Sequence, residues 1–317
     1  MAAEANPTPT TPDVKPPLVV IPADSRPERL GTPQLVTLGP RRIMTYHSGP
    51  KVTPTSTGHK TPIVLLAGTF VSSRYWLRLL PFLPTDRPVI AVDTVGVGQT
   101  SRARAPRDMA LLAQASMLFD LFEMLHLPAV DLLGASYGGN IALTFAGLHP
   151  DRVRSVVAIE TPIFTTSYEW LHQVRSGLQW LRAGRLTFWL AVKSGLLARH
   201  WTNTLLGRRL STAPGDKKSS VFRCFYDPNA RLSNWRALLR APIDDPMRPL
   251  AGLRAPLLGL QASESPLRNS LDHTHELLTR LTVPLNWHML PLSQHDMAVQ
   301  LPALVADAVS AFWHTLP

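Results

Sequence analysis

The chain has 317 residues, 45% of them hydrophobic and 17% charged, which is an ordinary soluble composition and enough for one large α/β domain with an inserted subdomain. Its one cysteine, Cys224, excludes an intramolecular disulfide, and every apolar run is shorter than a membrane span, so we expect no stable membrane insertion. The formal net charge of +10 comes from short, scattered basic groups, which indicates a solvated arginine-rich surface and no nucleic-acid partner.

Residues 1–33 differ from the rest of the chain, because they are rich in proline, threonine and alanine and have no helical periodicity. We predict that they form a disordered or extended tail. This segment has neither the basic start nor the apolar core of a secretory signal. Together with the single cysteine, this leads us to expect a cytoplasmic protein.

Strands and helices alternate along most of the remaining chain. Turn signals and periodicity predict strands over 34–38, 42–47 and 62–66, a helix over 73–83, a strand over 89–93, a helix over 109–125, a strand over 130–135, a helix over 137–148 and a strand over 153–160. After a gap, a strand over 256–261, a helix over 270–281, a strand over 285–290 and a last helix from about 297 to 313 follow. This order predicts a mostly parallel sheet with helices on both faces.

The alternation stops between residue 161 and about residue 249, where the sequence is rich in helix formers. We therefore predict a core domain over 34–162 and 250–317 and a helical cap inserted over 163–249. We expect most of its aromatic side chains and leucines to pack the cap against itself or the sheet, and some of them to line the entrance of an apolar pocket. This indicates a small substrate with an apolar acyl or alkyl group. The aromatic residues are Tyr168, Trp170, Trp180, Phe188, Trp189 and Trp201.

Residues 130–139 place one serine between an apolar strand and a helix. The pattern Gly134-x-Ser136-x-Gly138 is typical of a sharp strand-to-helix turn, whose apex residue is strained and exposes its hydroxyl. The two glycines give the room that this turn needs. We therefore predict that Ser136 is a nucleophile.

A serine hydroxyl needs a base to take its proton, and that base needs a buried acid to orient it. Of the eleven histidines, only His295 lies in a loop between the last predicted strand and the last helix, where parallel sheets hold their sites. His273 and His275 beside Glu276 suggest a metal, but no third ligand accompanies them. We predict His295 as the base, no metal and no cofactor.

A developing oxyanion needs two preorganised donors. One is the backbone N–H of Tyr137, directly after the nucleophile, and the other is predicted to be that of Thr69, where Gly68 lets the chain approach closely. The glycine-rich stretch after Asp93 lacks the third glycine and the Lys-Ser/Thr pair of a phosphate loop, so we interpret it as a structural turn.

In this order the motifs resemble the α/β-hydrolase fold superfamily across residues 34–317. Ala67-Gly68 stands where many members have His-Gly, and the Asp93 turn, the Ser136 elbow and His295 follow. The resemblance implies an α/β-hydrolase sheet with an inserted helical cap. Ala67 departs from the usual pattern and leaves the oxyanion donors less well braced.

The acid also departs from the pattern. Most members have an aspartate after the seventh strand, where this chain has Ser265, with Glu264 one residue away. The other known location is the end of the sixth strand, where Glu160 stands, as in the haloalkane dehalogenase and luciferase-like branch that the chain resembles here. A carboxylate that closes an apolar strand is costly unless it is paired. We prefer Glu160 as the acid and keep Glu264 as the alternative.

That branch carries an aspartate nucleophile, so Ser136 favours acyl transfer over dehalogenase or epoxide-hydrolase chemistry. We expect a serine hydrolase that cleaves a carboxylic ester or thioester. Two alternatives stay open: an acyltransferase with the same acyl-enzyme, and a non-catalytic binding protein on the same fold. The sequence sets neither the substrate's identity nor the oligomeric state.

Overall fold

The computed structural model describes residues 30–51, 60–69, 71–163 and 244–316, with the single positions 190, 237 and 241. Most of the predicted tail and cap lies outside these residues. Leu30 is buried and the first strand begins at Thr32, so residues 30–33 belong to the folded core and not to the tail. In the part of the chain that is described, no helix has both the length and the hydropathy to cross a membrane.

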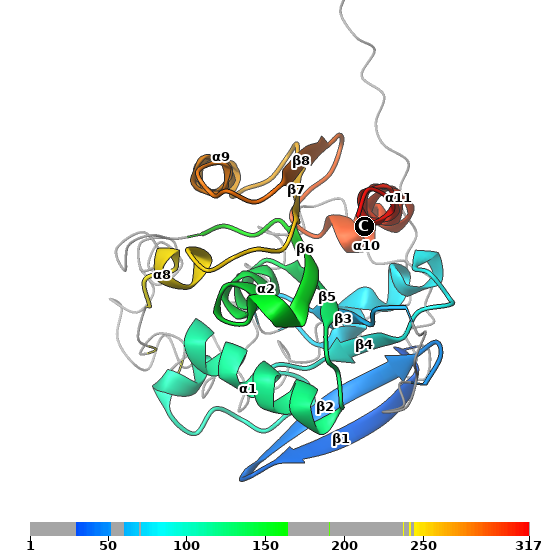
Figure 1. Cartoon of the computed structure of the whole chain (residues 1–317), viewed down its shortest axis with the longest axis vertical. Helices are drawn as coiled ribbons and strands as arrows, with labels where there is room; N and C mark the ends of the chain where they lie inside the picture. The colour runs from blue at the N-terminus through cyan, green and yellow to red at the C-terminus, as the bar shows by residue number, and fades with distance from the viewer. Residues whose placement is uncertain are drawn as a thin grey trace, which may run out of the picture.

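The core is one eight-stranded sheet (Figure 1), with the strand order β1-β2-β4-β3-β5-β6-β7-β8. β2 pairs antiparallel with β1 and with β4, and every other pair of neighbours is parallel, which confirms the predicted sheet. The strands are β1 Thr32–Leu38, β2 Arg41–Ser48, β3 Ile63–Leu66, β4 Val89–Val92, β5 Val130–Ala135, β6 Val153–Ile159, β7 Leu257–Ala262 and β8 Leu285–Leu290.

Helices cover both faces of the sheet (Figure 1). One core contains side chains from α1, α2, α8 and α9, and the other contains side chains from η2, α10 and α11. The α-helices are α1 Leu111–Met124, α2 Tyr137–Leu148, α8 Met247–Leu250, α9 Arg268–Thr279, α10 Met297–Gln300 and α11 Pro302–His314, and the 3-10 helices are η2 Ser73–Arg78, η3 Leu80–Phe82, η4 Pro106–Met109 and η5 Pro150–Arg152.

The central strands are apolar without interruption because both of their faces are buried. In β3, Val64 and Leu66 point to the core under α1 and α2, whereas Ile63 and Leu65 point to the core under η2 and α11. This period of two is the ordinary geometry of a strand. A sheet covered in this way leaves its strand ends as the place for polar chemistry.

Two predicted helices differ from the observed ones, and proline is the reason in both cases. The predicted helix over 73–83 is a pair of 3-10 helices, η2 and η3, and Pro81 inside η3 has no N–H to continue an α-helix. The predicted last helix is divided at Leu301, whose φ of −128° is not helical. Pro302 disfavours a helical conformation of the preceding residue and starts α11 at its first position.

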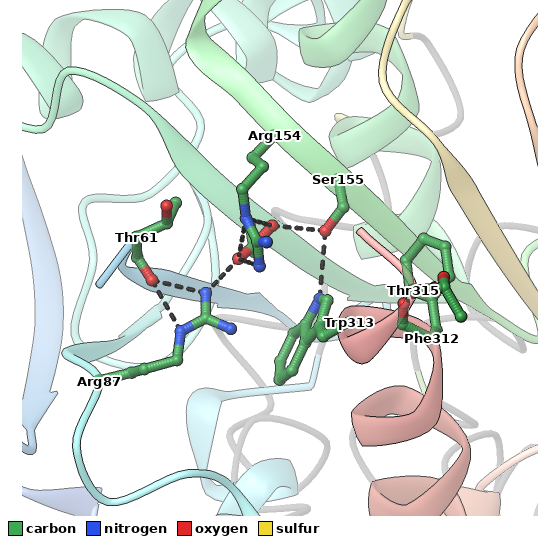
Figure 2. A network of polar contacts seen from close by, with 8 residues as sticks. Thr61, Arg87, Arg154, Ser155, Phe312, Trp313 and Thr315 are labelled. Carbon is green, nitrogen blue, oxygen red and sulfur yellow. Dashed lines mark hydrogen bonds and ion pairs between the residues drawn. The ribbon is translucent and has the colours of Figure 1, made fainter. Parts of the chain in front are cut away.

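A buried ionic network joins the start of β5 to α11 (Figure 2). Asp131 is fully buried and accepts hydrogen bonds from Arg87 and Ser155, and from Arg154 Nε at 3.1 Å. Trp313 Nε1 donates to Ser155 Oγ at 3.1 Å, and the Arg87 guanidinium lies 4.5 Å from the centre of the Trp313 ring. The network ties two strands and the last helix together at the end of the sheet opposite to Ser136.

Candidate active site

The C-terminal ends of β5 and β6 hold the predicted nucleophile and the preferred acid. Ser136 directly follows β5 and Glu160 directly follows β6. The Ser136 N–H donates to Ile159 O at 2.8 Å, and the Glu160 N–H donates to Leu260 O at 2.8 Å. Since these strands are parallel, both side chains leave the sheet at the same edge.

The elbow at Ser136 has the strained geometry that its sequence predicts. Ser136 has a φ of 52° and a ψ of −119°, a conformation that a non-glycine residue adopts only when its surroundings impose it. A Cβ on Gly134 would lie 2.5 Å from Gly138 O, and a Cβ on Gly138 would lie 2.1 Å from Leu66 O. Both glycines are therefore required by close backbone contacts.

His295 meets the carboxylate of Glu160. The imidazole is 7% exposed, and its Nδ1 lies 3.1 Å from Glu160 Oε2. Because an ionised carboxylate only accepts hydrogen bonds, Nδ1 carries the proton in this pair, and the other ring nitrogen, Nε2, is left to accept one. This is the tautomer that a general base needs.

Glu160 is fully buried and its carboxylate is held by three donors. Oε1 accepts from the Ala262 N–H at 2.6 Å, and Oε2 accepts from Ser265 Oγ at 2.5 Å and from His295. The other candidate acid, Glu264, has an exposed side chain, and its N–H donates to Ser293 O at 2.9 Å. The structure thus brings Glu160 to Nδ1 of His295.

The pKa of His295 is raised above its usual 6.5: burial lowers it, but the hydrogen bond to Glu160 and the charges of Glu160 and Asp296 outweigh burial. The pKa of Asp296 is raised to about 6 by burial and by the charge of Glu160, against the opposite effect of His295. Burial and the charges of Asp296 and Glu160 also raise the pKa of Tyr75 well above 10. The carboxylate of Glu160 therefore stabilises the protonated form of the His295 imidazole.

The predicted oxyanion donors lie beside the nucleophile. The Tyr137 N–H opens α2 and, as the first amide of a helix, has no acceptor within it. The Tyr137 hydroxyl donates to Met109 O, which anchors the ring away from that amide. A Cβ on Gly68 would lie 3.4 Å from Ser136 Cβ, so the loop that carries Thr69 passes directly over the serine.

The stretch after Asp93 is a tight turn built around a buried carboxylate. Asp93 Oδ1 accepts from the Ser73 N–H at 2.7 Å and Oδ2 accepts from the Gln99 N–H at 3.3 Å. Gly98 has a φ of 55°, and a Cβ there would lie 1.9 Å from Asp93 Oδ2. The contact with Asp93 accounts for Gly98 and supports the interpretation of this stretch as a structural turn.

The histidines of α9 have neighbours of their own. His275 stacks on Trp287 with ring centres 4.7 Å apart, and His273 Nδ1 lies 4.0 Å from Glu276 Oε2. Within the described ranges, no three His, Cys, Asp or Glu side chains gather as metal ligands would.

Sequence reasoning missed two residues of this site. Asp296 directly follows His295, and its charge raises the pKa of the imidazole. Ser265 stands out in the sequence only as the lack of an aspartate, whereas in the structure its hydroxyl donates to the carboxylate of Glu160. The first could have been found from its place in the sequence, but the second depends on how the turn after β7 folds back toward β6.

The chain is similar to several curated proteins over part of their length. It is 34% identical to a putative 2-succinyl-6-hydroxy-2,4-cyclohexadiene-1-carboxylate synthase of Bacillus subtilis over 99 residues, 31% of this chain and 36% of that protein. It is 33% identical to the 1-acylglycerol-3-phosphate O-acyltransferase ABHD5 of Rattus norvegicus over 127 residues, 39% of this chain and 36% of that protein. The match therefore spans about a third of the length of these relatives.

Solved structures match over far more of the chain. MGS-M2, an alpha/beta hydrolase from a Medee basin deep-sea metagenome library, has a TM-score of 0.70 at 20% identity, covering 89% of this chain and 97% of that one. Naproxen esterase from Bacillus subtilis has a TM-score of 0.65 at 18% identity, covering 90% and 94%. The sequence model of the alpha/beta hydrolase fold matches residues 61–286, more than half of the chain. The chain therefore belongs to the alpha/beta hydrolase fold family.

Proposed function

We propose that the chain is a serine hydrolase that cleaves a carboxylic ester or thioester through an acyl-enzyme on Ser136. The observation that carries the proposal is the contact of His295 Nδ1 with the buried carboxylate of Glu160, at the sheet edge where Ser136 stands in a strained elbow. In serine hydrolases, a buried acid orients a histidine that activates the hydroxyl of a serine in such an elbow, which supports the proposal.

In this mechanism Ser136 Oγ attacks the acyl carbonyl carbon while Nε2 of His295 takes the hydroxyl proton. The backbone N–H groups of Thr69 and Tyr137 stabilise the negative charge on the carbonyl oxygen. His295 then gives its proton to the leaving alcohol or thiol as the acyl–oxygen or acyl–sulfur bond breaks. Water, deprotonated by His295, then attacks the carbonyl carbon of the acyl-enzyme. His295 returns that proton to Ser136 Oγ as the acyl–Oγ bond breaks and the carboxylic acid leaves. Glu160 stabilises the imidazolium in both halves of the reaction.

We propose an apolar acyl or alkyl group on the substrate. Relatives support this: one is the monoacylglycerol lipase ABHD6 of Rattus norvegicus, 31% identical over 101 residues, and naproxen esterase shares the fold. The predicted cap over 163–249, with its aromatic side chains, remains our proposal for the wall of the acyl site. It lies outside the described residues, apart from its ends and the single positions 190, 237 and 241. A cytoplasmic location and the lack of a nucleic-acid partner likewise remain expectations from composition.

The first test replaces the nucleophile. Ser136→Ala should abolish hydrolysis of short p-nitrophenyl esters and labelling by a fluorophosphonate probe, while the melting temperature stays close to that of the unchanged protein. Unchanged turnover in Ser136→Ala would refute the proposal.

A matched pair of variants tests the acid. Glu160→Gln keeps the shape but not the charge, and should lower kcat by about 10²- to 10⁴-fold, the range seen when the charged partner of a catalytic base is lost. Glu264→Gln makes the same chemical change on an exposed side chain one residue from Ser265, and should leave kcat unchanged. Equal losses in both variants would contradict the assignment of Glu160.

A second candidate function is acyl transfer, which uses the same acyl-enzyme with an alcohol or thiol in place of water. The name of the ABHD5 relative, an acyltransferase, favours it. Product analysis with and without added glycerol decides between them, since a transferase forms the new ester at the expense of the free acid. The non-catalytic alternative, motivated by Ala67 and Ser265, predicts no labelling of Ser136 by the fluorophosphonate.

A further inference from the structure

In the turn after β7, the hydroxyl of Ser265 contacts the carboxylate of Glu160. Ser265 Oγ lies 2.5 Å from Glu160 Oε2, while the Leu267 N–H donates to Ser265 Oγ at 3.1 Å. A hydroxyl has one proton to give. Because an N–H occupies its acceptor side, that proton is directed at Glu160. The contact therefore has a fixed direction, from Ser265 to the carboxylate.

The same oxygen serves His295. Glu160 Oε2 lies 3.1 Å from His295 Nδ1, while Oε1 is held by the Ala262 N–H at 2.6 Å. The hydroxyl and the imidazole therefore share the negative charge of one oxygen. Because Glu160 and His295 are buried and Ser265 is partly buried, water screens the division of that charge only weakly.

We propose that Ser265 is a positioning residue, whose hydroxyl fixes the Glu160 carboxylate and limits how strongly Oε2 attracts the proton of His295. The backbone also closes this turn, because the Ser265 N–H donates to Ala262 O at 3.3 Å, so the turn does not depend on the hydroxyl and its contact with the Leu267 N–H alone. The kinetic consequence rests on the proposed function, whereas the effect on the His295 titration does not.

Loss of the hydroxyl has a definite sign. Without it, Oε2 keeps His295 as a donor but no longer shares its charge with Ser265, so the imidazolium becomes more stable and the pKa of His295 rises. The ionisable groups that face this pair are Asp296, the next residue in the chain, and Tyr75 from η2, which interacts with both carboxylates. Ser265→Ala changes neither Asp296 nor Tyr75, so we assign the expected rise in the pKa of His295 to the loss of the hydroxyl.

The experiment measures the His295 titration by NMR in protein with ¹⁵N-labelled histidine, assigned by its loss in His295→Gln. Ser265→Ala should raise the His295 pKa by about 0.5 to 1 unit, the shift that corresponds to one ordinary hydrogen bond. Ser265→Thr keeps a hydroxyl and should restore the value of the unchanged protein. Ser263→Ala, in the same turn, is the matched control, and the pKa of His295 in this variant should equal that of the unchanged protein. A Ser265→Ala protein that titrates like the unchanged one overturns the proposal.

Kinetics give a second readout. Ser265→Ala should move the acid limb of the profile of kcat/KM against pH to higher pH by the same amount. It should also lower kcat by about 10-fold with KM unchanged, because the Glu160 carboxylate is less well fixed. If Ser265→Ala fails to fold, Glu160→Ala with Ser265→Asp replaces it: a carboxylate at 265 reaches the space of Oε2 and should recover at least about 10-fold of the kcat lost in Glu160→Ala.

If Ser265→Asp restores no kcat to the Glu160→Ala protein, the proposal is overturned. Failure of this proposal for Ser265 can be distinguished from failure of the proposed function. A chain that hydrolyses no ester still shows the histidine titration, and a chain that loses turnover in Ser136→Ala but not in Ser265→Ala refutes only the role of Ser265.

Discussion

Gly138→Ala should displace the proposed oxyanion donors, the N–H groups of Thr69 and Tyr137, and so lower activity more than it lowers stability. A Cβ at this position would lie 2.1 Å from Leu66 O and 2.5 Å from Ala67 O, and both contacts are with backbone that leads into Thr69. Real Cβ contacts do not fall below 3.0 Å, so either that loop or the start of α2 must move by about 0.9 Å. The movement separates the N–H groups of Thr69 and Tyr137. A misplacement of about 1 Å costs about 10²-fold in rate, which is the loss of kcat/KM that we expect.

The assay compares p-nitrophenyl ester hydrolysis with the fraction folded, measured by circular dichroism at the same temperature. Gly147→Ala is the control, because its Cβ would lie 2.0 Å from Pro249 O, an equal clash on the same helix but against α8. Both variants should lose stability by about 1–3 kcal/mol, as overpacking does. Only Gly138→Ala should lose activity per folded molecule. Equal activity of the two folded variants would refute the role of this contact in catalysis.

Three further results are expected. Since His295 must be neutral to act as base and its pKa is raised, kcat/KM should fall as pH drops through a midpoint above 6.5. Asp296→Asn removes a charge that raises this pKa, so the midpoint of the pH profile should move down; an upward move contradicts the assignment. Asp131→Ala leaves the guanidinium of Arg87 buried without its carboxylate (Figure 2), and urea unfolding should show a loss of about 3–5 kcal/mol with kcat per folded molecule unchanged.

The strands and the elbow could be predicted from sequence because their causes are local. Continuous apolar runs follow from burial of both faces of the sheet. The two glycines around Ser136 are required because the backbone there lies close to residues a few positions away or to the adjacent strand. Prolines were equally visible: Pro81 and Pro302 mark the places where predicted helices differ from the observed ones.

The acid could not be decided in this way. The contact between Glu160 and His295 joins residues 135 positions apart, and it depends on the register of β6, β7 and β8 together with the path of two loops. The sequence favours Glu160 but leaves Glu264 open as the alternative acid, because both residues follow strands that end at the same edge. Burial separates them, and burial follows from tertiary structure.

The backbone of Glu264 contributes to this site by holding the loop that precedes His295. Its N–H donates to Ser293 O at 2.9 Å, and the fully buried Ser293 hydroxyl donates to Leu290 O at 2.6 Å, two contacts that hold the loop in front of His295. Ser136 and Glu160 are fixed by direct backbone hydrogen bonds to neighbouring strands, whereas the position of His295 depends on this loop. Ser293→Ala should therefore lower kcat by loosening His295, while Glu264→Gln, which keeps the N–H, should not.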